Sequence, residues 1–209
     1  MKKIIVSTLL AMATVASFAQ GSISVGNGIN TTRFPIYGPQ VGSETIQTVG
    51  SSSLSAPAGT TVYTGGLLSG TRYKIEFWAG PSSATDFSGL TLITTTTFRT
   101  ASGAATSLPN GLTQTVLGSV PGVVADAQAR LGVRVWDTLS EQGGAGYGFA
   151  GIRGQSPALS LSSGLGGGLT TPPSWVGQSF SLTVVPEPTS MALAGIGAAS
   201  LLIFRRRNK

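Results

Sequence analysis

The fold is decided by the segment Thr71-Arg72-Tyr73-Lys74-Ile75-Glu76-Phe77-Trp78-Ala79, in which side chains of two kinds alternate. One face carries the apolar set Tyr73, Ile75, Phe77 and Ala79. The other face carries Arg72, Lys74, Glu76 and Trp78. A period of two residues predicts a half-buried β-strand, and Gly80-Pro81 ends it with a turn signal.

A second segment with the same period runs from Ala129 to Trp136 and places Leu131, Val133 and Val135 on its inner face. Weaker strand candidates follow along the chain at 22–25, 60–64, 90–100, 147–152, 158–162 and 179–184. Glycine, proline, asparagine and serine clusters separate them, and only 123–130 has a locally helical pattern. We therefore expect an all-β chain, with residues 20–185 forming a single antiparallel β-sandwich or jelly-roll-like domain.

The N-terminus has the pattern of a secretory signal peptide. Lys2 and Lys3 precede an apolar run over 4–16, and Ser17-Phe18-Ala19 supplies small residues for a peptidase. The apolar run is shorter than the roughly 20 residues that a membrane span needs. We expect a signal helix over 1–19, with cleavage by signal peptidase after Ala19.

The C-terminus combines three features over 186–209. Pro186-Glu187-Pro188 is followed by an apolar run over 191–204 and then by Arg205-Arg206-Arg207. Positive charge favours the cytoplasmic side, so the domain would lie outside the inner membrane. The run is short and rich in small residues, which predicts a short transmembrane helix that resides only transiently in the inner membrane.

In this order, the three features resemble the PEP-CTERM sorting signal. The resemblance implies recognition by an exosortase-type membrane enzyme, cleavage near the Pro-Glu-Pro and release to the cell envelope or extracellular matrix. The stretch from Arg134-Val135-Trp136-Asp137 through Pro172-Pro173 to Gln178-Ser179-Phe180-Ser181-Leu182 is also similar in layout to other PEP-CTERM proteins. That similarity implies no particular activity.

Composition narrows the function classes further. The chain has a net charge of +6, but residues 20–185 hold seven basic and six acidic side chains, which leaves +1. The domain therefore has no basic excess suited to nucleic acid. There is no cysteine and no histidine, so disulfides, thiolate chemistry and the commonest general base are absent from the sequence. We expect no cofactor and no metal site.

Candidate catalytic motifs are weak. Paired carboxylates could hydrolyse a glycoside, but Glu76 shares its face with Lys74, which favours a solvated charge pair. Asp137 and Glu141 lack the spacing of a calcium loop, and Asp137 is expected to cap a turn. The glycines of 146–151 fit Gly-x-Gly-x-x-Gly, yet the residues that follow cannot continue a helix, which favours a glycine-rich turn.

Trp78 and Trp136 both lie on the face away from the expected core. Exposed aromatic rings on a sheet could stack on sugars. Alternatively a loop or a second sheet covers them, as is usual for large aromatic side chains. We expect an exported, non-enzymatic protein with a structural or adhesive role, for which polysaccharide is a candidate partner. A carbohydrate-binding module is the alternative hypothesis, and a glycoside-active hydrolase is the third and least favoured one.

Overall fold

The computed structural model describes residues 20–29, 32–40, 62–100, 111–140, 142–161, 163–167, 170–175, 177–185, 193, 196–197 and 200. The longer strands are β1 (Gln20–Val25), β5 (Tyr73–Pro81), β6 (Thr91–Thr97), β7 (Val116–Val124), β8 (Ala129–Asp137) and β9 (Ile152–Gln155). The two-residue strands are β2 (Gly28–Ile29), β3 (Thr32–Arg33), β4 (Ile36–Tyr37), β10 (Leu159–Ser160), β11 (Phe180–Ser181) and β12 (Thr183–Val184). Two 3₁₀ turns, η1 (Phe87–Gly89) and η2 (Gly143–Ala145), lie in loops.

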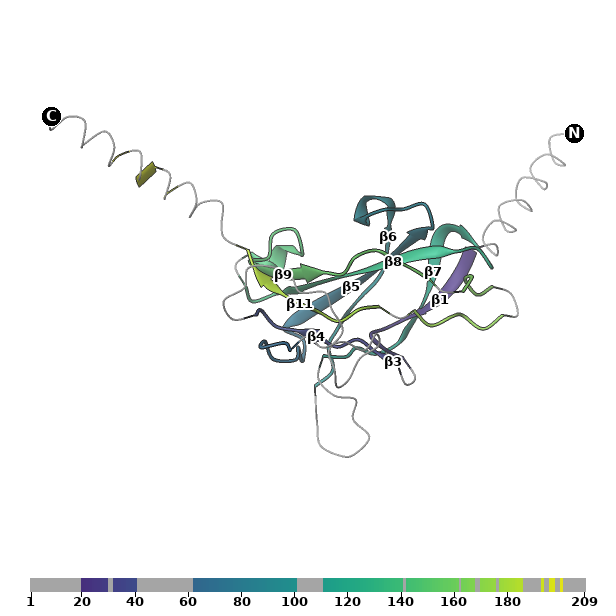
Figure 1. The fold of residues 1–209 in the computed structure, drawn as a ribbon, viewed down its shortest axis with the longest axis horizontal. Helices are drawn as coiled ribbons and strands as arrows, with labels where there is room; N and C mark the ends of the chain where they lie inside the picture. Colours follow the sequence, from purple (N-terminus) through teal and green to yellow (C-terminus); the bar gives the residue numbers. More distant parts are fainter. Residues whose placement is uncertain are drawn as a thin grey trace, which may run out of the picture.

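The main sheet has the order β12-β9-β8-β5-β6, and β10 also pairs with β8. All of its pairings are antiparallel. β5 and β8 form the longest ladder, in which Phe77 lies opposite Val133 and Ile75 opposite Val135. This register places the alternating apolar residues of both strands on the same face. The two segments with the clearest period therefore pair with each other at the centre of the sheet (Figure 1).

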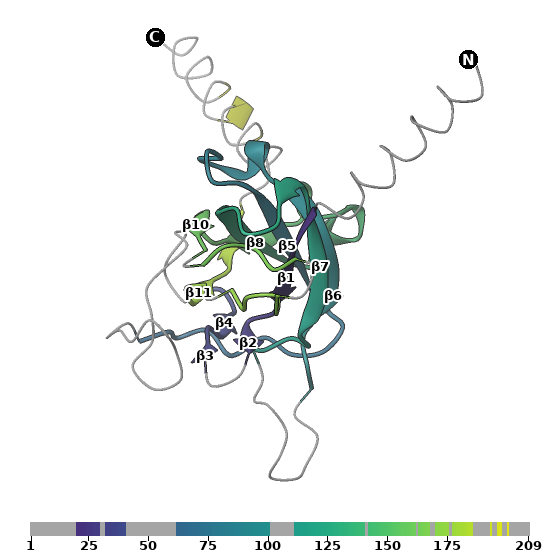
Figure 2. The same ribbon diagram turned by 90° about the vertical axis from the view of Figure 1, so that its right-hand side faces the viewer.

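The apolar face of the main sheet is covered by shorter pieces of sheet. β1 pairs antiparallel with β7, β2 antiparallel with β3, and β11 runs parallel to β4. β7 and β1 lie beside β5 and β6 in the view of Figure 2, and Gly118 of β7 approaches the Ile93 side chain of β6 so closely that no Cβ would fit. The largest fully buried side chains of the core include Ile23, Phe34, Ile36, Ile75, Phe77, Leu131, Trp175, Phe180 and Leu182.

The all-β prediction is confirmed, whereas the predicted sandwich or jelly roll is not. The described residues form one six-stranded sheet and three two-stranded sheets rather than two extended sheets packed face to face. The short strands alternate with irregular segments that bond through isolated bridges, such as Ser22 with Gly166 and Phe98 with Thr113.

Three local predictions are wrong. The strand candidate 60–64 is not a strand over its described residues, 62–64. Residues 123–130 are not helical, because β7 continues to Val124 and the chain turns at Asp126, which has a φ of 62°. The stretch 147–152 is not a strand; its residues form turns before β9 begins at Ile152. β7 was not predicted, because Gly118, Pro121 and Gly122 interrupt its alternation.

Both targeting segments lie mostly beyond what the structure describes. The signal helix over 1–19 is outside the described residues, and so the proposed boundaries of the domain stay predictions. Within the apolar run 191–204, Leu193, Ile196, Gly197 and Ser200 are helical, and the Ser200 hydroxyl donates to the Ile196 carbonyl at 2.8 Å. Among the described residues, no helix has the length and apolar character needed to cross a membrane.

Candidate functional site

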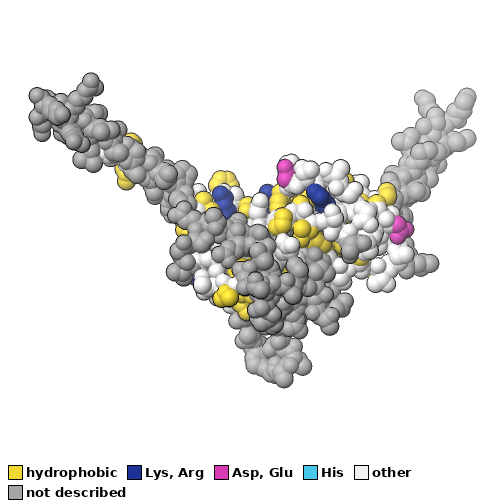
Figure 3. Space-filling model, viewed as in Figure 1, with side chains coloured by type: hydrophobic (Ala, Val, Ile, Leu, Met, Phe, Trp, Pro, Cys, Tyr) yellow, Lys and Arg dark blue, Asp and Glu magenta, His cyan; other side chains and the backbone are white. Residues whose placement is uncertain are grey.

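The face of the main sheet that points away from the core is covered by two loops rather than by strands. The loop between β5 and β6 carries Phe87 on η1, and the loop between β8 and β9 carries η2 and Tyr147. Gly132 of β8 allows the first loop to approach, since a Cβ there would lie 2.6 Å from Phe87 Cζ. The missing side chain lets the phenyl ring pack directly on the sheet. In Figure 3, apolar and basic side chains lie side by side on the upper surface of the molecule.

Arg134 of β8 lies between the two loops. Its guanidinium carbon lies 4.3 Å from the ring centre of Phe87, 4.9 Å from that of Tyr147 and 5.0 Å from that of Trp78. A cation over aromatic faces is attracted by the ring quadrupoles. We call Trp78, Phe87, Arg134, Tyr147 and Arg153 the arginine–aromatic cluster.

Trp78 and Trp136 occupy different environments, although both lie on the outer face as predicted. Trp136 is 4% exposed, donates from Nε1 to the Gly143 carbonyl at 3.1 Å and packs edge-to-face on Tyr147. A loop thus covers Trp136, and its indole is not available at the surface. Trp78 is half-buried, packs edge-to-face on Phe87 and belongs to the cluster.

Tyr147 and Arg153 tie the glycine-rich loop to β9. The Tyr147 hydroxyl donates to Gln155 Oε1 at 3.2 Å, and Arg153 donates from Nη1 to the carbonyls of Tyr147 and Gly148. Burial raises the pKa of Tyr147 above its usual value, and the nearby Arg134 and Arg153 partly offset this. Sequence reasoning missed the roles of Phe87 and Tyr147, because loop residues show no periodicity, and of Arg153, because β9 has only four residues.

Glu76 on the outer face and the buried Asp137 are both held by structural hydrogen bonds. Glu76 accepts from Trp78 Nε1 at 2.9 Å, and this bond replaces the predicted pair with Lys74. The only ion pair among the described residues joins Arg72 to Asp137 instead. Neither finding gives a second carboxylate poised to assist Glu76.

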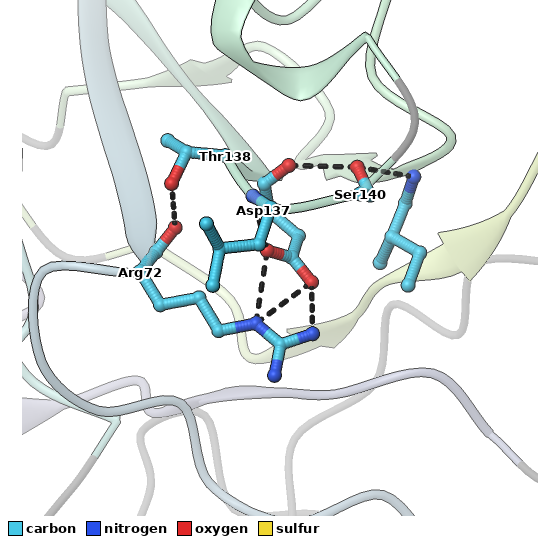
Figure 4. Close-up of polar contacts among 6 residues, drawn as sticks. Arg72, Asp137, Thr138 and Ser140 are labelled. Atoms are coloured by element: carbon cyan, nitrogen blue, oxygen red, sulfur yellow. Dashed lines mark hydrogen bonds and ion pairs between the residues drawn. The ribbon is translucent and has the colours of Figure 1, made fainter.

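Asp137 caps the turn after β8, as predicted. Its carboxylate accepts from the Leu139 N–H at 2.9 Å, and Arg72 Nε donates to both of its oxygens at 3.0 Å (Figure 4). Asp137 is fully buried whereas the Arg72 side chain is 51% exposed, and this hydrogen bond is the main cause that raises the pKa of Arg72. The Ser140 hydroxyl donates to the Asp137 carbonyl and accepts from the Ile152 N–H.

The remaining motif-based expectations concern metals and nucleotides. No group of three or more potential ligands gathers within the part of the chain that the structure describes, and Glu141 lies outside that part. The Gly-x-Gly-x-x-Gly stretch forms turns and leads into β9 rather than into a helix. This geometry agrees with a glycine-rich turn and differs from that of a dinucleotide site.

The C-terminal tail leaves the domain at the free edge of the main sheet. β12 pairs with β9, with Val184 opposite Ile152, and the Val185 N–H donates to the Gly151 carbonyl at 2.7 Å. The predicted sorting residues Pro186, Glu187, Pro188, Arg205, Arg206 and Arg207 lie outside the described residues.

The chain is rich in antiparallel β-strands, and its last strand ends just before Pro-Glu-Pro, an apolar run and an arginine cluster. This is the organisation of an exported sorting substrate. Residues 184–207 match the family model of the PEP-CTERM protein-sorting motif. The motif implies an exported protein that is processed at the membrane and recognised by an exosortase-type enzyme. Neither a curated protein nor a solved structure gives a significant match to the chain.

Proposed function

We propose that this chain is a non-enzymatic protein of the bacterial envelope or extracellular matrix, with a structural or adhesive role. The sorting motif over 184–207 carries the proposal. It begins inside strand β12 and would direct the β-rich domain before it to the envelope or matrix. Glu76, considered for glycoside hydrolysis, and Asp137, considered with Glu141 for cation binding, are both engaged in hydrogen bonds that stabilise the fold.

The test compares two changes in the tail. Deletion of 186–209 should leave the protein unprocessed by the sorting enzyme and change its location. Replacement of Pro186, Glu187 and Pro188 by alanine, with the apolar run and arginines intact, should leave an uncut precursor in the inner membrane. Fractionation and immunoblotting give both readouts. Unchanged location and processing in both variants would contradict the proposal.

A second function, glycan binding, is favoured by the arginine–aromatic cluster. Trp78 and Tyr147 are half-buried rings with part of their surface in solvent, and Lys74 is exposed on the same outer face. Aromatic rings beside cations suit the apolar faces and acidic groups of polysaccharides.

A glycan array with the exported domain tests this second function. Trp78→Ala and Tyr147→Ala should each reduce retention, because each removes a stacking surface. Leu117→Ser on β7 is the matched control, since Leu117 is 65% exposed but lies outside the cluster. Glycan binding is excluded if the unaltered protein is retained by no glycan, or if the control variant loses retention equally.

A further inference from the structure

Three exposed apolar side chains belong to segments that adjoin the point where the tail leaves the domain. Leu139 is 76% exposed, Phe149 64% and Val184 53%. They come from three segments that meet at Gly151-Ile152: Val184 pairs with Ile152, the Ile152 N–H donates to Ser140 beside Leu139, and Phe149 lies two residues before Gly151. We call Leu139, Phe149 and Val184 the tail-exit edge.

The tail-exit edge is held in place by the fold. Ser140 bonds to the Asp137 carbonyl at 2.7 Å, which fixes the turn that carries Leu139. Arg153 donates to the carbonyls of Tyr147 and Gly148, which fixes the loop ahead of Phe149. Trp136 bonds to Gly143 beneath the same loop. The exposure of these apolar side chains is therefore a built feature of this end of the sheet.

The length of the tail limits how far this edge can be from the membrane. The hydrogen bond from Val185 to Gly151 is the last described contact before the motif. Five residues, 186–190, separate Val185 from the apolar run that begins at Met191. Even fully extended, that stretch spans about 20 Å. While the apolar run is in the bilayer, Val185 must lie within that distance of it, and the segments that carry the tail-exit edge meet next to Val185.

We propose that the tail-exit edge docks on the phospholipid surface while the precursor awaits processing. This inference rests on the proposed sorting at the membrane. The free energy of apolar side chains falls when they enter the boundary between headgroups and acyl chains. A short tether raises their effective concentration there. Arg153, next to Ile152 on β9, adds a cation beside the edge that suits anionic headgroups. Docking would hold the domain in one orientation beside the membrane during processing.

The chain contains no cysteine, so a single introduced thiol can report on one position. Full-length Phe149→Cys and Leu139→Cys carry an environment-sensitive nitrobenzoxadiazole label and are reconstituted in vesicles of phosphatidylethanolamine and phosphatidylglycerol. The matched control is Thr95→Cys, an exposed site on β6 at the opposite edge of the sheet. Each is also made with a spacer of about 20 glycine and serine residues after Val185, whose mean span is about 25 Å.

Docking predicts blue-shifted emission at positions 139 and 149, with quenching by nitroxide lipids, and neither effect at position 95. Both effects should persist with the spacer, and Val184→Ser in the labelled chains should weaken them. Equal signals at 95 and 149 would overturn the proposal. So would loss of the effects with the spacer, which would mean tethering alone, or a concentration-dependent signal without lipid quenching, which would mean contact with a second copy. The vesicles contain no sorting enzyme, so a failure here is distinct from a failure of the proposed sorting.

Discussion

The two faces of the main sheet are made by the same strands but held by different forces. The inner faces of β5 and β8 place Ile75, Phe77, Val133 and Val135 in the core with no exposed surface. The outer faces of these strands carry Arg134 and half-buried Trp78 beneath two loops. Burial without directional contacts stabilises the inner face, whereas the outer face depends on specific pairs. The difference predicts that removing a side chain destabilises the fold more on the inner face than on the outer face.

The largest expected effect comes from the inner face. Phe77→Ala removes a fully buried ring and leaves a cavity, which should lower the free energy of unfolding by about 3–5 kcal/mol. Urea denaturation followed by tryptophan fluorescence measures the change. Lys74→Ala on the outer face of the same strand is the control and should change stability by less than about 0.5 kcal/mol. Similar losses in the two variants would contradict the expectation that the inner face contributes more stability than the outer face.

A smaller effect is expected at the end of the sheet. Asp137→Asn removes the charge that pairs with Arg72 but keeps the shape and the oxygen that caps Leu139. Because Arg72 is half exposed, solvent screens the pair, and we expect a loss of about 1–2 kcal/mol in urea unfolding. Arg72→Lys should lose less than Asp137→Asn. A loss of 4 kcal/mol or more, estimated on the scale of fully buried pairs, would show that the charge is screened less than its exposure indicates.

The arginine–aromatic cluster gives the next prediction. Arg134→Met keeps an unbranched stem but removes the cation above Trp78, Phe87 and Tyr147, and should lower stability by about 1 kcal/mol. Arg134→Lys should recover part of that loss, since it restores a charge without the planar group. The same urea measurement applies to both variants. If Arg134→Met is as stable as the unaltered chain, the cluster contributes no stability to the outer face.

The smallest effect concerns alkaline pH. Burial raises the pKa of Tyr147, so the folded state holds this proton more tightly than the unfolded state, whose tyrosine titrates near 10.0. The resulting stabilisation is fully present below pH 10 and is lost as the pH rises through the raised pKa of the folded state. Tyr147→Phe should flatten the fall of melting temperature above about pH 10. Tyr73, whose pKa burial also raises, keeps a remaining slope. An unchanged pH profile would contradict the assignment to Tyr147.

Much of this arrangement follows from local sequence pattern. The alternation in 71–79 and 129–136 predicted β5 and β8 and their inner faces, because a period of two places side chains on one side of any strand. The order of Pro-Glu-Pro, apolar run and arginines identified the sorting motif, because such a signal is linear. The turn-capping role of Asp137 was also within reach, since short polar side chains bond to nearby backbone.

Only the tertiary structure decided what covers each residue. Nothing in the spacing of Trp78 and Trp136 shows that one ring stays half open while the other lies beneath the η2 loop, because that depends on contacts between segments far apart in the chain. Gly132 interrupts the pattern of its strand, and only the structure explains why: the Phe87 ring packs where a Cβ would lie. The sequence determined the address of the protein and its central strands. Long-range packing decided which side chains remain at the surface where the tail departs, since the chain must first bring Leu139, Phe149 and Val184 together.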